Sequence, residues 1–271
     1  SAASDVYKRQ WLLCNRALAV PSSSEPQSLR PYTQSIAHDA GWQWRIPLQH
    51  RTGNGHVYCD RFISEDEATK VLLDNLEGEP LKDPLSLGFT PGCRKQLWHR
   101  NCIALGLASG FIEPLESTSI HLVQIGITNL VKLFPTKGDN AAKEREYNRR
   151  MRYEYEAIRD FIILHYHQTE REDTPFWKHV KHMSIPDNLQ NKIDSFRESG
   201  HLYRIDEELF TEVGWLQVMM GQGIRPQRYN ALADTLSKDD VAEYLKNLNT
   251  IMTSTVKKLQ PYPEFVKTCA Q

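Results

Sequence analysis

Two glutamates flank a proline in residues 110–121, directly before an apolar stretch. Glu113 and Glu116 are followed by hydroxyl side chains at 117–119, a type favoured where helices begin. Apolar residues then recur at helical spacing, at Ile120, Val123, Ile127, Leu130, Val131 and Phe134. The first amides of such a helix lack intrahelical acceptors and can hold a small anion. A carboxylate beside an anion site indicates chemistry, although the same residues also fit an acidic cap on a buried helix.

Two tryptophans separated by one residue form the second notable motif. In a β-strand, Trp42 and Trp44 would point to the same face of the sheet. Two aromatic residues filling a core are the simplest interpretation of this pattern. The glycines at 53–55 predict a hairpin turn that joins a strand over 42–48 to one over 57–63.

The remaining pattern predicts an α+β fold with a β-rich first quarter and a mainly helical remainder. A capping box at Ser64 and Glu67 opens a helix that runs to about residue 76, and a proline-broken connection covers 80–91. Further helices are predicted over 141–168, 187–199, 206–214, 215–221 and 238–260. Residues 1–10 differ in character from the rest of the chain, and we expect them to be a non-native leader.

Composition argues against several classes of protein. The 271-residue chain has a net charge of −1, which gives no electrostatic reason to expect nucleic acid or an anionic membrane as a partner. No apolar run approaches the roughly 18 residues of a membrane span, and the N-terminus has no signal-peptide pattern. Five scattered cysteines fit reduced thiols, so we expect a cytoplasmic protein.

Taken together, the two motifs resemble those of the flavin-dependent tryptophan halogenase family. The Trp-x-Trp-x-Ile-Pro signature of that family is present as Trp42, Trp44, Ile46 and Pro47, and its glutamate segment matches residues 113–118. The resemblance covers about residues 11–260. It implies that residues 11–135 are the C-terminal part of a flavin-monooxygenase-type FAD and halide domain, and that residues 136–271 form a helical region that covers and binds the substrate.

The resemblance also implies the chemistry. In this family hypohalous acid forms from reduced FAD, oxygen and halide, and a lysine passes the oxidised halogen to an aromatic ring. Glu116 matches the catalytic glutamate, and Glu113 matches the structural one before the proline. Chloride or bromide would be held by the backbone amides of Thr118 and Ser119, although many members have glycine where this chain has Ser119. A separate flavin reductase would supply the reduced FAD.

Two further groups of residues are implied by the resemblance. The tunnel between flavin and substrate would be lined by Trp42, Trp44, Ile46, Pro47 and Ser117. Phe210, Trp215 and Gln222 stand where tryptophan-specific members use paired tyrosines and a glutamate to grip the amino acid. The pocket is therefore expected to take an indole-like aromatic, free indole as well as tryptophan. Packing in a helix core explains Trp215 equally well.

Some parts of a complete enzyme are absent from the sequence. A Gly-x-Gly-x-x-Gly turn after an early strand would hold the FAD pyrophosphate, but the late Gly221-Gln-Gly223 has no third glycine. The catalytic lysine belongs to the same N-terminal part. Residues 105–110 resemble a second flavin-contacting segment, with Leu107 where aspartate is usual. We expect this chain to be a C-terminal fragment that is inactive alone.

Two alternatives stay open. One is a flavin-dependent aromatic monooxygenase that hydroxylates its substrate, and the other is a non-catalytic helical interaction module with an exposed apolar helix face. A homodimer is also left open. The histidines at 165, 167, 179 and 182 invite a metal interpretation, but residues two apart on a helix point in different directions. No acidic or cysteine ligand has fitting spacing, so no metal is expected.

Overall fold

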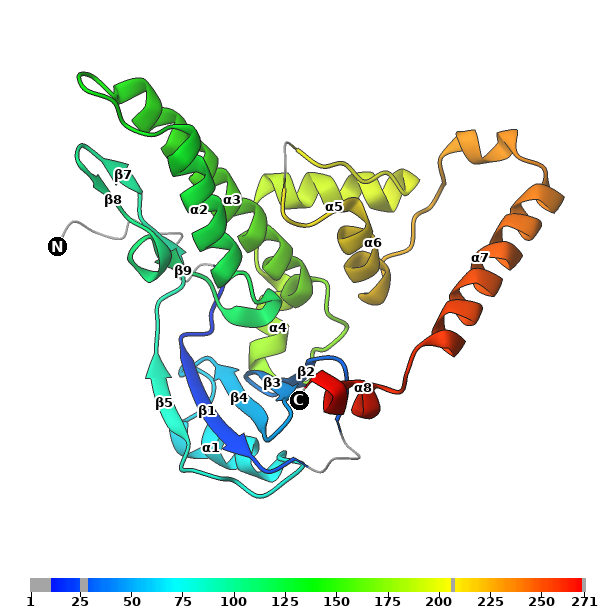
Figure 1. Cartoon of the computed structure of the whole chain (residues 1–271), viewed down its shortest axis with the longest axis horizontal. Helices are drawn as coiled ribbons and strands as arrows, with labels where there is room; N and C mark the ends of the chain where they lie inside the picture. The colour runs from blue at the N-terminus through cyan, green and yellow to red at the C-terminus, as the bar shows by residue number, and fades with distance from the viewer. Residues whose placement is uncertain (1–10, 25–28, 206–207, 270–271) are drawn as a thin grey trace.

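The computed structural model describes residues 11–24, 29–205 and 208–269, so the expected leader at 1–10 lies outside the described residues. A five-stranded antiparallel sheet in the order β2-β3-β4-β1-β5 forms the lower layer of the molecule (Figure 1). Its strands are β1 (Arg16–Ser22), β2 (Gln34–His38), β3 (Gly41–Pro47), β4 (Thr52–Tyr58) and β5 (Leu85–Gly88). Strand β5 lies within residues 80–91, where the prolines had predicted a connection without a strand.

Helices and two small hairpin-like sheets complete the chain. Strand β6 (Gly92–Cys93) pairs with β9 (Gly110–Phe111), and β7 (Trp98–His99) pairs with β8 (Cys102–Ile103). The helices are α1 (Glu65–Asp74), α2 (Ser119–Lys132), α3 (Ala141–His167), α4 (Pro175–His182), α5 (Asp187–Ser199), α6 (Glu212–Gly221), α7 (Lys238–Lys258) and α8 (Tyr262–Cys269). The structure is thus α+β, as the sequence predicts, with a sheet first and helices after it.

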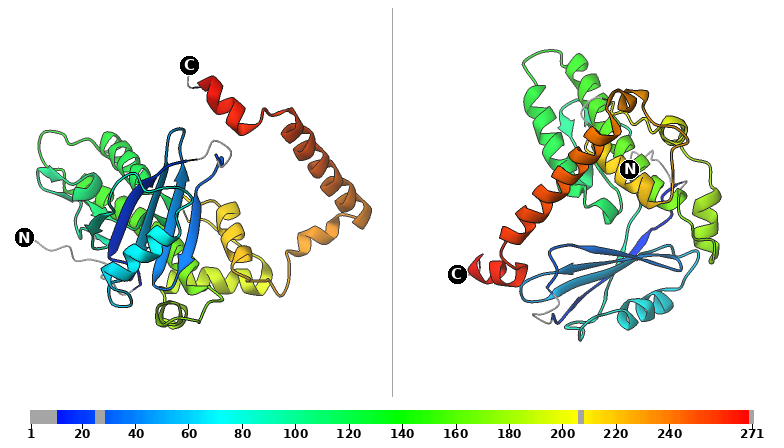
Figure 2. Two further views of the ribbon diagram at one scale, coloured as in Figure 1. Left: turned by 90° about the horizontal axis from the view of Figure 1, so that it is seen from below. Right: turned by 90° about the vertical axis from the view of Figure 1, so that its right-hand side faces the viewer.

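Helices cover both faces of the sheet. Helix α1 packs on one face, where Ala68 and Leu72 contact Leu18, Val20 and Tyr58. The helical layer formed mainly by α2 to α6 lies on the other side (Figures 1 and 2). The capping box predicted for α1 is confirmed, because the Ser64 hydroxyl accepts from the Glu67 amide and the Glu67 carboxylate accepts from the Ser64 amide.

The long helix α3 is the central element of the main hydrophobic core. Its buried side chains include Tyr147, Met151, Tyr155, Ile158 and Ile162. Towards the C-terminal end of α3 nearly every side chain is buried, because α2, α4, α5 and α6 all contact this helix. A helix enclosed in this way can present side chains to several neighbours at once.

The hairpin between β3 and β4 is real, but its predicted turn was wrong. The chain reverses at residues 48–51, where the Leu48 amide donates to the Arg51 carbonyl at 2.9 Å, and Gly53 and Gly55 lie inside β4. Gly55 is paired with Trp44 across the hairpin. A Cβ atom on Gly55 would lie 2.0 Å from Cζ2 of the Trp44 indole. The glycine therefore makes room for the aromatic ring rather than for a turn.

Two helix predictions also need correction. Helix α2 begins where expected, but it buries Leu122, Gly126 and Asn129, while Ile120, Ile127, Val131 and Phe134 are exposed. Most side chains of the predicted apolar row are thus exposed on the surface of the protein. The helix predicted over 206–214 is wrong in its described part: α6 begins only at Glu212, where the Thr211 hydroxyl caps the Gly214 amide. Before it, the Glu208 carboxylate accepts from Lys192 and from Tyr153, which holds the chain in an irregular form.

The C-terminal helices extend from the body of the molecule. Helix α7 projects away from the other helices in Figure 1 and in the left view of Figure 2. Its residues are exposed except for the half-buried Val241. Its apolar surface includes Tyr244, Leu248, Ile251 and Val256. Among the described residues, no helix combines the length and the apolar character that crossing a membrane requires.

The close approach of Trp44 to β4 gives a first prediction. Replacing Gly55 with alanine should destabilise the protein by about 1–3 kcal/mol, since the added methyl group overlaps the indole. Gly53→Ala is the matched control, because its Cβ would lie 3.9 Å from the nearest Ile46 atoms. Urea unfolding of both variants measures the difference. Equal stability of the two variants would show that Trp44 does not need this space.

Candidate functional site

A short 3-10 turn at Pro114–Glu116 connects β9 to α2 and sets the positions of both glutamates. Pro114 fixes the backbone at the start of this turn, and the Ser117 amide donates to the Pro114 carbonyl at 3.0 Å. Ser117 then adopts a left-handed conformation, with φ of 53°, which redirects the chain into α2. As a result Glu113 points into the core, whereas Glu116 stays at the surface of the helical layer.

Glu113 is held by a buried polar network. Its carboxylate is 0% exposed and accepts a 2.5 Å hydrogen bond from the Tyr166 hydroxyl on α3. The same hydroxyl lies 3.6 Å from the Cys14 Sγ. Burial raises the pKa of Glu113 to about 7, while the Tyr166 hydroxyl and the Trp42 indole N–H oppose that rise. This environment suits a residue that fixes the turn, which is the structural role expected for Glu113.

Glu116 meets a histidine that no sequence motif indicated as its partner. Its Oε1 atom lies 3.0 Å from Nε2 of His165, and the side chains are 30% and 20% exposed, respectively. The other ring nitrogen of His165, Nδ1, lies 2.8 Å from the Phe161 carbonyl oxygen. Glu113 and Glu116 therefore contact consecutive residues of α3, Tyr166 and His165. The partially exposed Glu116 is the carboxylate that a bound molecule could reach.

The start of α2 supplies backbone amides without a side-chain cap. Thr118 stands at the N-cap position, but its hydroxyl makes no capping hydrogen bond. Thr118 is buried, and Ser119 and Ser117 are exposed. The amides of the first turn of this 14-residue helix carry partial positive charge and lie directly after Glu116. A small anion could bind them, as predicted for Thr118 and Ser119.

The tryptophan motif lies on β3. Trp42 and Trp44 are on the same side of the strand, with ring centroids 6.1 Å apart. Trp42 is 4% exposed and approaches Glu113, and Trp44 is half-buried over Gly55. Ile46 and Pro47 lie further along β3, opposite Gly53 and Thr52 at the hairpin end. Trp42 thus approaches the glutamate turn, and the whole predicted tunnel lining, Trp42 included, stays a prediction.

The three residues predicted for a substrate pocket converge on one stretch of α3. Phe210 stacks on Phe161 with centroids 3.8 Å apart, and Trp215 meets the same ring edge to face at 4.8 Å. The Gln222 side chain donates to the His165 carbonyl at 3.2 Å. Trp215 is 2% exposed, with the Lys192 ammonium group 4.1 Å from its ring centroid. Packing accounts for Trp215, while Phe210 and Gln222 remain half-buried near Glu116's partner.

Comparison with known proteins decides the family. The sequence profile for tryptophan halogenase matches residues 4–238. The chain belongs to the tryptophan halogenase family.

Individual relatives agree with this assignment. The chain is 39% identical over 195 residues to tryptophan 6-halogenase ThaL of Streptomyces albogriseolus, a match that covers 69% of this chain and 36% of that protein. Among solved structures, Xcc4156, a flavin-dependent halogenase from Xanthomonas campestris, aligns with a TM-score of 0.92 at 45% identity. BrvH, a flavin-dependent halogenase from Brevundimonas sp. BAL3, aligns with a TM-score of 0.92 at 37% identity. These two alignments cover 96% and 97% of this chain but 52% and 54% of those chains. The chain therefore spans about half the length of these solved relatives.

The family membership raises the question of how the described residues fit a flavin. Residues 105–110 offer it mainly backbone groups, since Leu107 is 79% exposed. The carbonyl of Gly106 already accepts from Ser109, and that of Ala108 accepts from Arg94. The Ser109 amide is also used, because it donates to the Gly106 carbonyl at 2.9 Å. The sequence has no Gly-x-Gly-x-x-Gly turn for the pyrophosphate, and flavin contact by this loop stays a prediction. Within the described ranges, no group of three or more His, Cys, Asp or Glu side chains could hold a metal ion.

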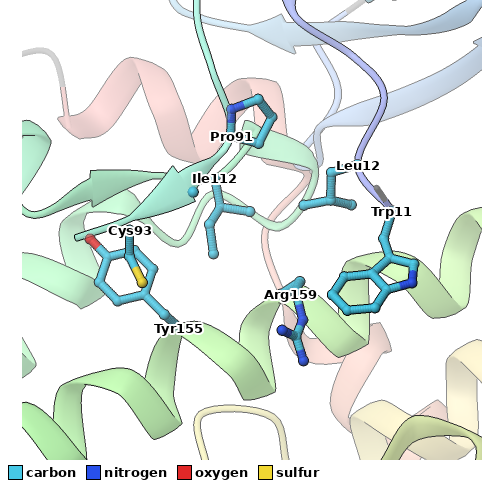
Figure 3. Close-up of a pocket in the computed structure, with 8 residues that line it drawn as sticks. Trp11, Leu12, Pro91, Cys93, Ile112, Tyr155 and Arg159 are labelled. Atoms are coloured by element: carbon cyan, nitrogen blue, oxygen red, sulfur yellow. The ribbon is translucent and has the colours of Figure 1, made fainter. Parts of the chain in front are cut away.

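A small, mostly apolar cavity lies beside the glutamate turn (Figure 3). It is lined by Trp11, Leu12, Pro91, Gly92, Cys93, Ile112, Tyr155 and Arg159. The Arg159 guanidinium lies 4.9 Å from the centre of the Trp11 ring, which closes one side. No predicted site residue and no carboxylate lines this cavity. It is therefore separate from the site at Glu116.

Sequence reasoning missed His165 and Phe161 as members of the site. It placed His165 along one side of the amphipathic helix predicted over 141–168 and also considered it for a metal site, and it assigned Phe161 no role. The signal that could have found them is their spacing, because residues four apart on a helix share a face. Phe161 and His165 form such a pair on the part of α3 that faces Glu116.

The buried Glu113 predicts a pH-dependent stability. Burial makes the pKa of the Glu113 carboxyl higher in the folded protein than in the unfolded chain. The contribution of Glu113 to the free energy of unfolding is therefore present at low pH and is lost as the pH rises through about 7. The shift from 4.5 to about 7 corresponds to roughly 3 kcal/mol. Glu113→Gln should remove this loss, so its stability relative to the wild type should rise between about pH 5 and about pH 8.

Urea unfolding at the two pH values measures this difference. Glu243→Gln, on the exposed surface of α7, serves as the control and should follow the wild type. If the wild type and Glu113→Gln change in parallel with pH, Glu113 does not titrate as its burial requires.

Proposed function

We propose that this chain provides the halide site and the base of a FAD-dependent halogenase that acts on an indole-like aromatic. The observation that carries the proposal is the position of Glu116. It is an accessible carboxylate directly before the uncapped start of α2, and its partner His165 borders the aromatic group of Phe161 and Phe210. A halide site and a base must lie near an aromatic ring for halogenation, and the proposal assigns both to this segment.

The start of α2 would hold the halide. The backbone amides of Thr118 and Ser119 point from the positive end of the helix dipole, and no side chain caps them. Chloride and bromide are both compatible with amide donors, because neither needs a directional partner. Glu116 precedes these amides, so the anion and the carboxylate would occupy opposite sides of the Ser117 bend.

The reaction needs an oxidant that this chain does not itself supply. When bound, reduced FAD with oxygen supplies the oxidising equivalents that convert halide to hypohalous acid. A flavin reductase is the proposed source of the reduced cofactor, and we place the protein in the cytoplasm. Trp42 and Trp44 would form the wall between the flavin and the substrate. We assign the catalytic lysine to no lysine of this chain.

Glu116 would act as the base after the halogen reaches the ring. Halogen addition leaves a positively charged ring intermediate with hydrogen and halogen on the same carbon. The C–H bond then breaks, its electron pair restores the aromatic ring, and the proton passes to a Glu116 oxygen. A positioned carboxylate contributes about 10²–10⁴-fold to such a proton transfer.

The substrate is proposed to be an indole that need not carry an amino-acid group. Phe210, Trp215 and Gln222 are all committed to contacts with α3 or to packing, and none is charged. A tryptophan substrate would need partners for its ammonium and carboxylate groups. The aromatic ring alone can be recognised by stacking and exclusion of water.

Replacing Glu116 with glutamine tests the proposed base. In the chain joined to the flavin domain of a related halogenase, with a flavin reductase, halide, oxygen and indole, the wild type should form halogenated indole. Glu116→Gln should lower the rate by about 10²–10³-fold, because the amide cannot accept the proton. Glu243→Gln is the matched control for loss of a carboxylate and should retain activity.

The products separate the alternatives. Hydroxylated indole that forms without halide would favour the aromatic monooxygenase. Halogenation that is unaffected in Glu116→Gln would remove Glu116 from the mechanism. No product in any variant, with normal flavin binding, would favour the interaction module.

A substrate comparison tests the pocket. We expect free indole to have a kcat/KM at least equal to that of tryptophan, since no charged group is positioned for the amino acid. The two substrates are compared in the same joined enzyme by product formation. A preference for tryptophan of about tenfold or more would contradict this account of the pocket.

A further inference from the structure

His165 and Glu116 form an ion pair when the imidazole ring is protonated on both nitrogens. The Phe161 carbonyl lies 2.8 Å from Nδ1 and can only accept, so the hydrogen-bond network places a hydrogen on Nδ1. The Nε2 atom lies 3.0 Å from Oε1 of Glu116. A proton on Nε2 therefore places the positive charge of the ring directly beside this carboxylate oxygen.

The surroundings of His165 keep its ring in place. Phe161 meets the His165 ring edge to face, with the ring centroids 5.1 Å apart. Phe210 in turn stacks on the Phe161 ring. Gln222 donates to the backbone carbonyl of His165. The nearby acidic groups are Glu116 and the buried Glu113, which interacts electrostatically with His165. The ring is thus fixed by packing and by its Nδ1 bond, and Nε2 is the atom it presents to Glu116.

Glu116 has no equivalent support. Its side chain is 30% exposed, and its second oxygen, Oε2, has no partner among the described residues. A glutamate side chain has several freely rotating bonds, so a partially exposed one samples many positions. The ion pair with His165 is the contact that restricts the Glu116 side chain.

We propose that His165 is a positioning residue that holds Oε1 of Glu116, so that Oε2 is the oxygen presented to the reacting ring. The proposal rests on the proposed function of Glu116 as the base. Loss of a proton from a positively charged ring is favourable even to a weak base, so the position of the base matters more than its strength. When Oε2 accepts the proton of the substrate ring, the proton on Nε2 of His165 stays in place. The C–H electron pair returns to the ring, and no further reactant is needed.

The first test measures the conformation of Glu116 without catalysis. In the wild-type chain, NMR couplings between the Hα and Hβ protons of Glu116 should report one dominant rotamer. His165→Phe keeps the ring shape but removes both nitrogens, and its couplings should become averaged over several rotamers. His165→Gln can still donate an N–H to Oε1 and should restore one rotamer. Couplings that are the same in the wild type and in His165→Phe would overturn the proposal.

The second test measures turnover in the chain joined to the flavin domain. His165→Phe should lower kcat by about 10²-fold with the KM for indole within about threefold, as expected when a base is displaced rather than a pocket destroyed. His165→Gln should recover at least about tenfold of that loss. A loss that appears in KM, or no recovery with glutamine, would contradict a positioning role.

Two controls separate the possible failures. His182→Phe removes an exposed histidine that lies 2.7 Å from Glu172, and it should alter neither the Glu116 couplings nor kcat. If Glu116→Gln is fully active while the Glu116 couplings respond to His165→Phe, the proposed function fails but the contact is real. If Glu116→Gln is inactive while the couplings do not respond, the function stands and the positioning role fails.

Discussion

The hydrogen bond from Tyr166 to Glu113 is the interaction on which the site depends. It joins the turn before α2 to the long helix α3 inside the core, where Glu113 is 0% and Tyr166 is 3% exposed. Because the turn is fixed at Glu113, Glu116 lies where it can reach the preceding helix residue, His165. The buried glutamate thus organises the site, and the accessible glutamate is the one available for chemistry.

The same helix connects this turn to the aromatic side chains. Phe161, one turn before His165, carries the contacts to Phe210 and Trp215. Helix α3 therefore carries the partner of Glu116 and also supports the ring cluster, and residues on a rigid element have a fixed geometry. The start of α2, which follows Glu116 in the sequence, adds the partial positive charge of its first backbone amides.

The sequence correctly predicted features that depend on residues close together along the chain. The capping box of α1 and the extent of α3 were predicted correctly, because both depend on residues that are close in sequence. The turn at residues 53–55 was wrong because Gly55 accommodates Trp44, a contact between strands. The pair His165 and Glu116 was missed for the same reason, since only the folded chain brings them together.

The exposed apolar side chains of α2 and α7 match part of what an interaction module would show. Membership of the tryptophan halogenase family favours an enzyme, and the chain spans about half the length of its solved relatives. The exposed apolar side chains of these two helices therefore do not decide between an enzyme and an interaction module.

The most direct test is to locate bromide in crystals of the chain by its anomalous scattering. The account predicts a bromide peak at the amides of Thr118 and Ser119, beside Glu116, that is lost when chloride replaces bromide. Bromide found only along basic surfaces such as Arg149 and Arg150, with none at the start of α2, would contradict the claim that this turn unites a halide site with a base.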